Sequence, residues 1–162
     1  MGLNAPGSEG VLIDNPSSGN SAGNSILNSV FEYFDVAARV GNTAQSYVSN
    51  VSIRYCYFEN TRGYEIVLGN QSNRAEAVSV TVEGNYFYSQ KSAVHAVYAR
   101  RTSGLSIRGC RSVNHSGASF DVLPDNMNFT IKSNVSEDAS LISVAPGARG
   151  RWETSNGLEA SQ

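Results

Sequence analysis

The chain has 162 residues and a mass of 17.3 kDa, which is enough for one domain with a buried core. Its formal net charge is −2 and its basic residues are scattered, so the sequence predicts neither nucleic-acid binding nor capture of an anionic membrane surface. It contains no apolar run of about 18 residues, so no membrane insertion is expected.

Serine, asparagine and glycine make up about a third of the residues, whereas lysine occurs twice. This composition favours many short strands joined by tight turns and disfavours long helices. The two cysteines do not form the framework of a disulfide-rich domain.

A repeat runs through most of the chain. Its copies occupy residues 26–32, 51–60, 80–89, 105–114 and 129–138, and residues 10–15 are a fragment of one more. The equivalent apolar residues Ile26, Ile53, Val82, Ile107 and Ile131 follow one another at intervals of 27, 29, 25 and 24 residues. Each copy alternates apolar and polar residues, which is the period of a half-buried strand.

Each coil contains two further strands after the first. The second lies near residues 57–58 and 86–87, and the third covers residues 64–69, 94–98, 120–124 and 141–144. Three strands per coil predict an all-β protein, a right-handed single-stranded parallel β-helix of about five to six coils. We expect the β-helix to span residues 10–147, with residues 1–9 as an N-terminal cap or linker and residues 148–162 as a C-terminal tail or cap.

The alignment also predicts which residues stack. One position of the turn is occupied by Cys56, Asn85, Cys110 and Asn134. The two cysteines would lie two coils apart, about 9.6 Å, so we expect free thiols. An outward column of Arg54, Glu83, Arg108 and Lys132 predicts a ladder of ion pairs.

The third strand carries the candidate catalytic residues Glu65, His95 and Asp121, which fall at the same offset in three consecutive copies. Stacked about 4.8 Å apart, they could serve a glycosidase, with two carboxylates or with His95 as a proton carrier. The alternative is a salt-bridge ladder on the surface. Two positions later stand Val67, Val97 and Leu123. If the charged column faces outward, this apolar column is exposed as well and needs a partner chain to cover it. The alternative is that the apolar column faces the interior.

The candidate carbohydrate-binding residues are Tyr57, Tyr86 and Tyr88, with Arg54 and Arg108 at the rim. Tyr57 and Tyr86 should stack outward on adjacent coils, where they bind sugar or merely cover apolar surface.

Glu32 and Glu59 share an offset in adjacent copies, which indicates either a site or a wrong alignment of the first copy. No His and Cys cluster has metal-ligand spacing, so neither a metal nor another cofactor is expected.

The repeat Val-Ser-Ile-Arg-x-Cys-x-Phe-x-Asn, complete at residues 51–60, resembles the pectate-lyase-like β-helix superfamily. Its Ser, Asn and Gly content with few lysines is most similar to the shafts of phage tailspikes. The resemblance implies a homotrimer on the virion tail, in the extracellular space, that binds bacterial capsule or O-antigen polysaccharide. The alternatives are a glycan hydrolase or lyase that degrades such a polysaccharide, and a purely structural shaft fragment. No Asp-rich calcium site or lyase motif of that superfamily has a match in this chain.

Overall fold

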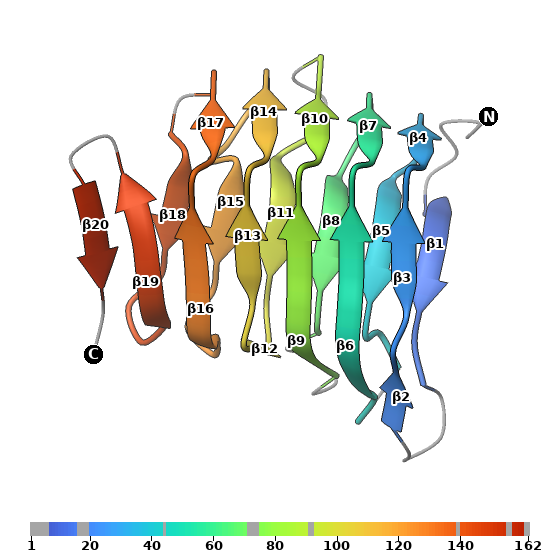
Figure 1. The fold of residues 1–162 in the computed structure, drawn as a ribbon. Coiled ribbons are helices and arrows are strands. Elements are labelled where there is room, and N and C mark those ends of the chain that lie inside the picture. Colours follow the sequence, from blue (N-terminus) through green and yellow to red (C-terminus); the bar gives the residue numbers. More distant parts are fainter. Residues whose placement is uncertain are drawn as a thin grey trace.

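Alternating apolar and polar side chains make each repeat into short strands, and successive repeats stack these strands in parallel. This computed structural model describes residues 7–15, 20–43, 45–70, 75–90, 93–138, 140–154 and 157–160. Over these ranges the regular elements are all strands, without a helix. Figure 1 shows the chain rising through the front strands and descending through the rear strands as it advances from right to left, which makes the coil right-handed. The predicted fold class is confirmed.

The strands form three sheets, numbered here by their order within a coil. Sheet 1 contains β2 (Asn20–Ala22), β3 (Ser25–Leu27), β6 (Tyr47–Arg54), β9 (Glu76–Glu83), β12 (Thr102–Ser103), β13 (Ser106–Arg108), β16 (Met127–Lys132), β19 (Arg149–Thr154) and β20 (Gly157–Ala160). Sheet 2 contains β4 (Val30–Glu32), β7 (Tyr57–Glu59), β10 (Tyr86–Tyr88), β14 (Arg111–Val113) and β17 (Val135–Ser136). Sheet 3 contains β1 (Glu9–Ile13), β5 (Val36–Val40), β8 (Tyr64–Leu68), β11 (His95–Ala99), β15 (Phe120–Val122) and β18 (Ile142–Val144).

The solenoid has about four complete turns, with partial coils before and after them. Sheet 3 contains six strands and sheet 2 contains five, so the predicted coil number holds when the partial coils are counted. At the C-terminal end, β19 adds to sheet 1 parallel to β16, with a register shift between Met127 and Phe129, and β20 turns back antiparallel to β19. The indole of Trp152 in β19 lies 5.7 Å from the ring of Phe129 and extends the core.

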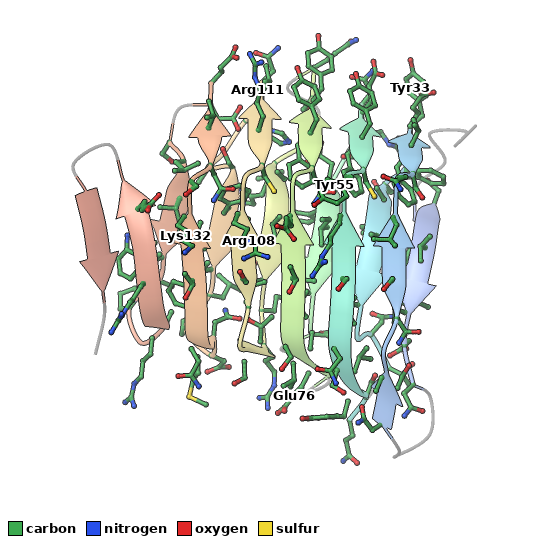
Figure 2. All side chains as sticks on the ribbon, viewed as in Figure 1. Tyr33, Tyr55, Glu76, Arg108, Arg111 and Lys132 are labelled. Carbon is green, nitrogen blue, oxygen red and sulfur yellow. The ribbon has the colours of Figure 1, made fainter. Side chains whose placement is uncertain are left out.

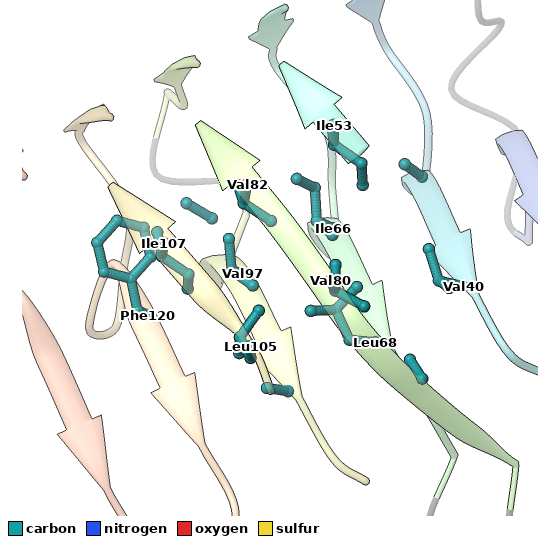
Figure 3. Packing of buried hydrophobic residues seen from close by; sticks show 14 of the residues in the cluster. Val40, Ile53, Ile66, Leu68, Val80, Val82, Val97, Leu105, Ile107 and Phe120 are labelled. Atoms are coloured by element: carbon teal, nitrogen blue, oxygen red, sulfur yellow. The ribbon is translucent and has the colours of Figure 1, made fainter. Parts of the chain in front are cut away.

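The inner face of sheet 1 carries the predicted file of aliphatic residues. Ile53 pairs with Val82, Val82 with Ile107, and Ile107 with Ile131 in the strand register. All four side chains have no exposed surface. Figure 3 shows members of this file facing side chains of sheet 3, among them Ile66, and these residues belong to one continuous core. The stacking on which the sequence analysis rests is therefore confirmed.

The turn between sheets 1 and 2 is held by the predicted column of asparagine and cysteine. The Asn85 side chain accepts a hydrogen bond from Cys56 N at 2.9 Å and donates one to Ile53 O at 2.9 Å. Asn134 repeats both bonds two turns later, accepting from Cys110 N and donating to Ile107 O. Each amide thus joins two coils. The two cysteines are buried and free, as predicted.

Three of the four residues in the outward column of sheet 1, Arg54, Glu83 and Arg108, form the predicted ion ladder. Glu83 lies between two arginines, 3.3 Å from Arg54 Nε and 3.0 Å from Arg108 Nε. These side chains are partly exposed, so each pair contributes at most about 1 kcal/mol to stability. Figure 2 shows Arg108 and Lys132 on this face.

At Gly69, the backbones of two neighbouring coils approach each other closely. Its φ is +67°, and a Cβ there would lie 2.7 Å from Arg101 O and 2.9 Å from Arg101 N. Gly104 has a similar φ of +72°, but a Cβ there meets nothing nearer than 3.6 Å.

We expect Gly104→Ala to lower the free energy of unfolding by about 1–2 kcal/mol through backbone strain. Gly69→Ala should lower it by a further 1–3 kcal/mol or so, because the backbone of the next coil must move. Urea unfolding of both variants measures the difference, and equal losses would contradict the close approach.

Candidate functional site

The predicted catalytic trio does not share one column. The register of sheet 3 pairs His95 with Tyr64, and Asp121 with Tyr98. Glu65 therefore lies one position off His95, and its side chain points into the solenoid with no exposed surface. The predicted alignment of Glu65, His95 and Asp121 is wrong, because a shift of one residue in a strand moves a side chain to the other face.

For the apolar column beside that trio, the inward alternative holds for Val97, whereas Leu123 is partly exposed. Val97 points inward and belongs to the core, so it is not part of an exposed strip. Val67 lies in the outward column opposite Tyr98, yet it is 1% exposed. Neither valine offers apolar surface to a partner chain.

An aromatic cluster covers the outer face of sheet 3. The rings of Tyr64 and Tyr98 stack with centroids 4.7 Å apart, and the His95 ring lies 6.0 Å and 5.7 Å from them. The guanidinium of Arg100 lies 4.7 Å from the centre of the Tyr98 ring, within cation–π range. Burial raises the pKa of Tyr64 above its usual value, and the neighbouring Tyr98 raises it further. This face is therefore ordered by ring stacking.

His95 and Asp121 are the two members of the trio that the fold brings together. His95 Nδ1 lies 2.6 Å from Ala118 O, and Nε2 lies 3.6 Å from Asp121 Oδ2. Both side chains are partly exposed. They form a surface pair beside the aromatic cluster.

Glu65 instead belongs to a buried ionic network with His115 and Asp138. His115 Nε2 lies 2.6 Å from Glu65 Oε2, and His115 Nδ1 lies 3.1 Å from Asp138 Oδ2. The side chains of His115 and of both carboxylates have no exposed surface. Since no atom of the network's ionic groups reaches solvent, its role is to hold the interior rather than to meet a substrate.

Serine hydroxyls complete this network. Ser112 Oγ donates to Asp138 Oδ2 at 2.6 Å, and Ser119 Oγ donates to the same oxygen at 2.7 Å. In the register of sheet 2, Ser112 and Ser136 continue the inner column of Phe58 and Phe87. The replacement of phenylalanine by serine in the aligned repeats is the sequence signal that could have located the network.

The protonation states of the network follow from these contacts. Burial alone would lower the pKa of His115, but the hydrogen bonds to Asp138 and Glu65 outweigh it and raise the pKa to about 9. Burial would raise the pKa of Asp138, but the bonds from His115 and Ser112 hold it well below its usual value. For Glu65, burial dominates and raises the pKa. His115 is thus a buried imidazolium near neutral pH.

The outward column of sheet 2 carries the predicted tyrosine stack. Tyr57 and Tyr86 pair in register, with ring centroids 5.4 Å apart and planes 2° from parallel. The guanidinium of Arg111 lies 5.8 Å from the centre of the Tyr86 ring, and Arg111 also pairs with Glu137. The predicted outward stacking of these tyrosines on adjacent coils is confirmed.

The five predicted carbohydrate-binding residues are divided between two sheets. Tyr57, Tyr86 and Tyr88 belong to sheet 2, whereas Arg54 and Arg108 belong to sheet 1 and are engaged with Glu83. Tyr55, which is 60% exposed, lies in the turn between these two sheets (Figure 2). Carbohydrate binding by these residues stays a prediction.

A groove of about 410 Å³ lies at the corner where sheet 3 leads into sheet 1. Its walls include Glu76, Arg101, Asp125 and Arg149, and Glu76 forms an ion pair with Arg101. The sequence alone does not locate this groove, because its residues come from four successive coils without a shared motif.

Comparison of the chain with protein-family models, curated proteins and solved structures finds no match. Among the described residues, no group of three or more His, Cys, Asp or Glu side chains could hold a metal ion. Within the same part of the chain, no helix is long and apolar enough to cross a membrane.

The network predicts a pH dependence of stability. The folded-state pKa of His115, about 9, exceeds the ordinary value of 6.5. The stabilisation is therefore complete below pH 6.5 and is lost as the pH rises through about 9, by on the order of 3 kcal/mol. Urea unfolding between these pH values measures this loss of stability. The variant His115→Gln should not show the loss, whereas the surface control His95→Gln should show it as the wild type does. Equal pH slopes for the wild type and His115→Gln, or an imidazole of His115 that titrates near 6.5 by NMR, would contradict the assignment.

Proposed function

We propose that this chain is a receptor-binding β-helix segment of a phage tailspike, placed on the virion tail outside the cell, that binds bacterial capsule or O-antigen polysaccharide. The observation that carries the proposal is the outward tyrosine stack of sheet 2, in which Tyr57 and Tyr86 lie 5.4 Å apart on neighbouring coils. The Ser, Asn and Gly content with few lysines, which resembles that of tailspike shafts, supports the same function.

The outer face of sheet 2 has the character of a binding surface rather than of a plain shaft. A shaft needs only a packed interior, but Tyr57, Tyr86 and Tyr88 are partly exposed on this face. Each ring is amphipathic, with apolar carbons and one hydroxyl that donates and accepts hydrogen bonds. Because strand pairing and stacking already fix these side chains, they lose little conformational entropy when a ligand binds.

The stacking geometry restricts how sugar could contact this row. Tyr57 and Tyr86 cover one face of each other, and Arg111 lies over the second face of Tyr86. The row therefore offers ring edges and hydroxyls along most of its length, which suit the hydroxyl groups of a polysaccharide.

Hydrolysis or elimination of a polysaccharide is the second candidate function. The observation that favours it is the partly exposed pair of His95 and Asp121, 3.6 Å apart and beside the aromatic cluster of sheet 3. A hydrolase of this kind needs a second accessible carboxylate, and Glu65 has no exposed surface. We therefore place binding ahead of catalysis.

Binding is tested by calorimetry with purified bacterial capsule and O-antigen polysaccharides. Loss of the stacked rings in the double variant Tyr57→Ala, Tyr86→Ala should weaken binding at least about tenfold, or about 1.4 kcal/mol. The double variant Thr81→Ala, Ser106→Ala, on the outer face of sheet 1, is the control and should bind normally. If the wild type binds none of these polysaccharides, the proposed function is wrong. Release of reducing ends or unsaturated uronate, lost in Asp121→Asn, would put the enzymatic function first.

We also propose that three copies of the chain assemble. Sheets 1 and 3 leave apolar side chains uncovered, for example Leu27 and Met127 in sheet 1 and Leu12 in sheet 3. Burial of such surface between chains stabilises an oligomer. Sedimentation equilibrium should give three times the chain mass of 17.3 kDa, and a monomer at all concentrations would refute the assembly.

A further inference from the structure

The tyrosine stack of sheet 2 ends asymmetrically. Its outward column runs Val30, Tyr57, Tyr86, Arg111 and Val135 in register. Tyr86 has a partner on both faces, the Tyr57 ring on one and the Arg111 guanidinium on the other. Among the described residues, Tyr57 has a ring partner on one face only. On its other side the column holds Val30, whose short side chain is 64% exposed.

The space beside Tyr57 has the thickness of one ring. Neighbouring coils are about 4.8 Å apart, and the rings of Tyr57 and Tyr86 fill one such step with centroids 5.4 Å apart. At the next step a valine stands where a third ring would continue the stack, so within the described part of the chain this column places no ring over the outer part of the Tyr57 face. A pyranose can occupy this step, because its axial C–H groups pack against an aromatic face.

Carboxylates stand beside this step. Glu32 pairs with Glu59 in the register, two positions after Val30 and Tyr57. This pairing shows that the first copy of the repeat was aligned correctly. Glu59 accepts a hydrogen bond from Asn60 Nδ2 at 3.1 Å, and after burial its charge is the next cause that raises the pKa of Tyr57. None of the ion pairs among the described residues involves either glutamate.

The negative charge of Glu32 and Glu59 favours an uncharged sugar over an anionic one. A carboxylate accepts hydrogen bonds from sugar hydroxyls, whereas it repels a uronate or another anionic sugar. Arg111, at the opposite end of the stack, is already paired with Glu137 and does not offset the two glutamates.

We infer that the open face of Tyr57, above Val30 and beside Glu32 and Glu59, is a subsite for one uncharged pyranose unit. This inference rests on the proposed function and narrows it, because it assigns the bound polysaccharide to the neutral class. The ring stacks on Tyr57, and its hydroxyls donate to the glutamates.

The experiment places a bulky side chain in the space beside Tyr57. Val30→Tyr continues the stack by one ring and occupies the subsite without disturbing the core, because Val30 faces outward. Val135→Tyr is the matched control, since Val135 lies in the same column, is 59% exposed, and is separated from the tyrosines by Arg111. The probes are O-antigen chains made only of neutral sugars and capsular polysaccharides rich in uronic acid.

We expect the wild type to bind a neutral chain, Val30→Tyr to bind it at least tenfold more weakly, and Val135→Tyr to bind it normally. Thermal unfolding should show that Val30→Tyr remains folded. The double variant Glu32→Gln, Glu59→Gln should gain affinity for uronate-rich chains, severalfold or more. If Val30→Tyr binds the neutral chain as well as the wild type does, or if the wild type prefers uronate-rich chains, the subsite is wrong while polysaccharide binding stands. If the wild type binds neither class, the proposed function fails, and the subsite fails with it.

Discussion

The whole structure depends on parallel stacking of coils at the spacing of paired strands, about 4.8 Å. Within the paired strands, a side chain of a complete turn has an equivalent on each neighbouring coil, so the interior is built from files rather than from isolated contacts. The file of Ile53, Val82, Ile107 and Ile131 has no exposed surface anywhere along its length. The same repetition acts outside, where Glu83 meets an arginine on each side, and in the turn, where Asn85 and Asn134 bind the backbone of neighbouring coils.

The periodic part of this arrangement could be predicted from the sequence. Sheet 1 carries the strongest signal, because its apolar and polar residues alternate over complete copies of the repeat. The register there, the inward file, the outward ion ladder and the free cysteines were all predicted correctly. The outward stack of Tyr57 and Tyr86 follows from the same alignment, since only three residues separate Ile53 from Tyr57.

The third strand could not be placed as well, and the candidate site depends on it. The turns that lead into sheet 3 vary in length between coils, so a short motif aligns there with an error of one residue. Such an error is enough to put Glu65 outside instead of inside. His115 was missed because it lies in a turn, where its partners Glu65 and Asp138 come from different coils. Contacts of this kind have no period in the sequence.

The bond between His115 and Glu65 bears on how the solenoid loses its structure. Most stabilising contacts join a coil to its immediate neighbour, so an isolated solenoid can fray one coil at a time from an end. His115 lies 50 positions beyond Glu65 and reaches it across the intervening coil, where Ala96 stands level with Glu65 and leaves space. Asp138 ties the next coil to the same imidazole. Unravelling from the C-terminal side would therefore stop at Asp138 until the charge network opens, and the coils from Glu65 to Asp138 should melt as a single cooperative block.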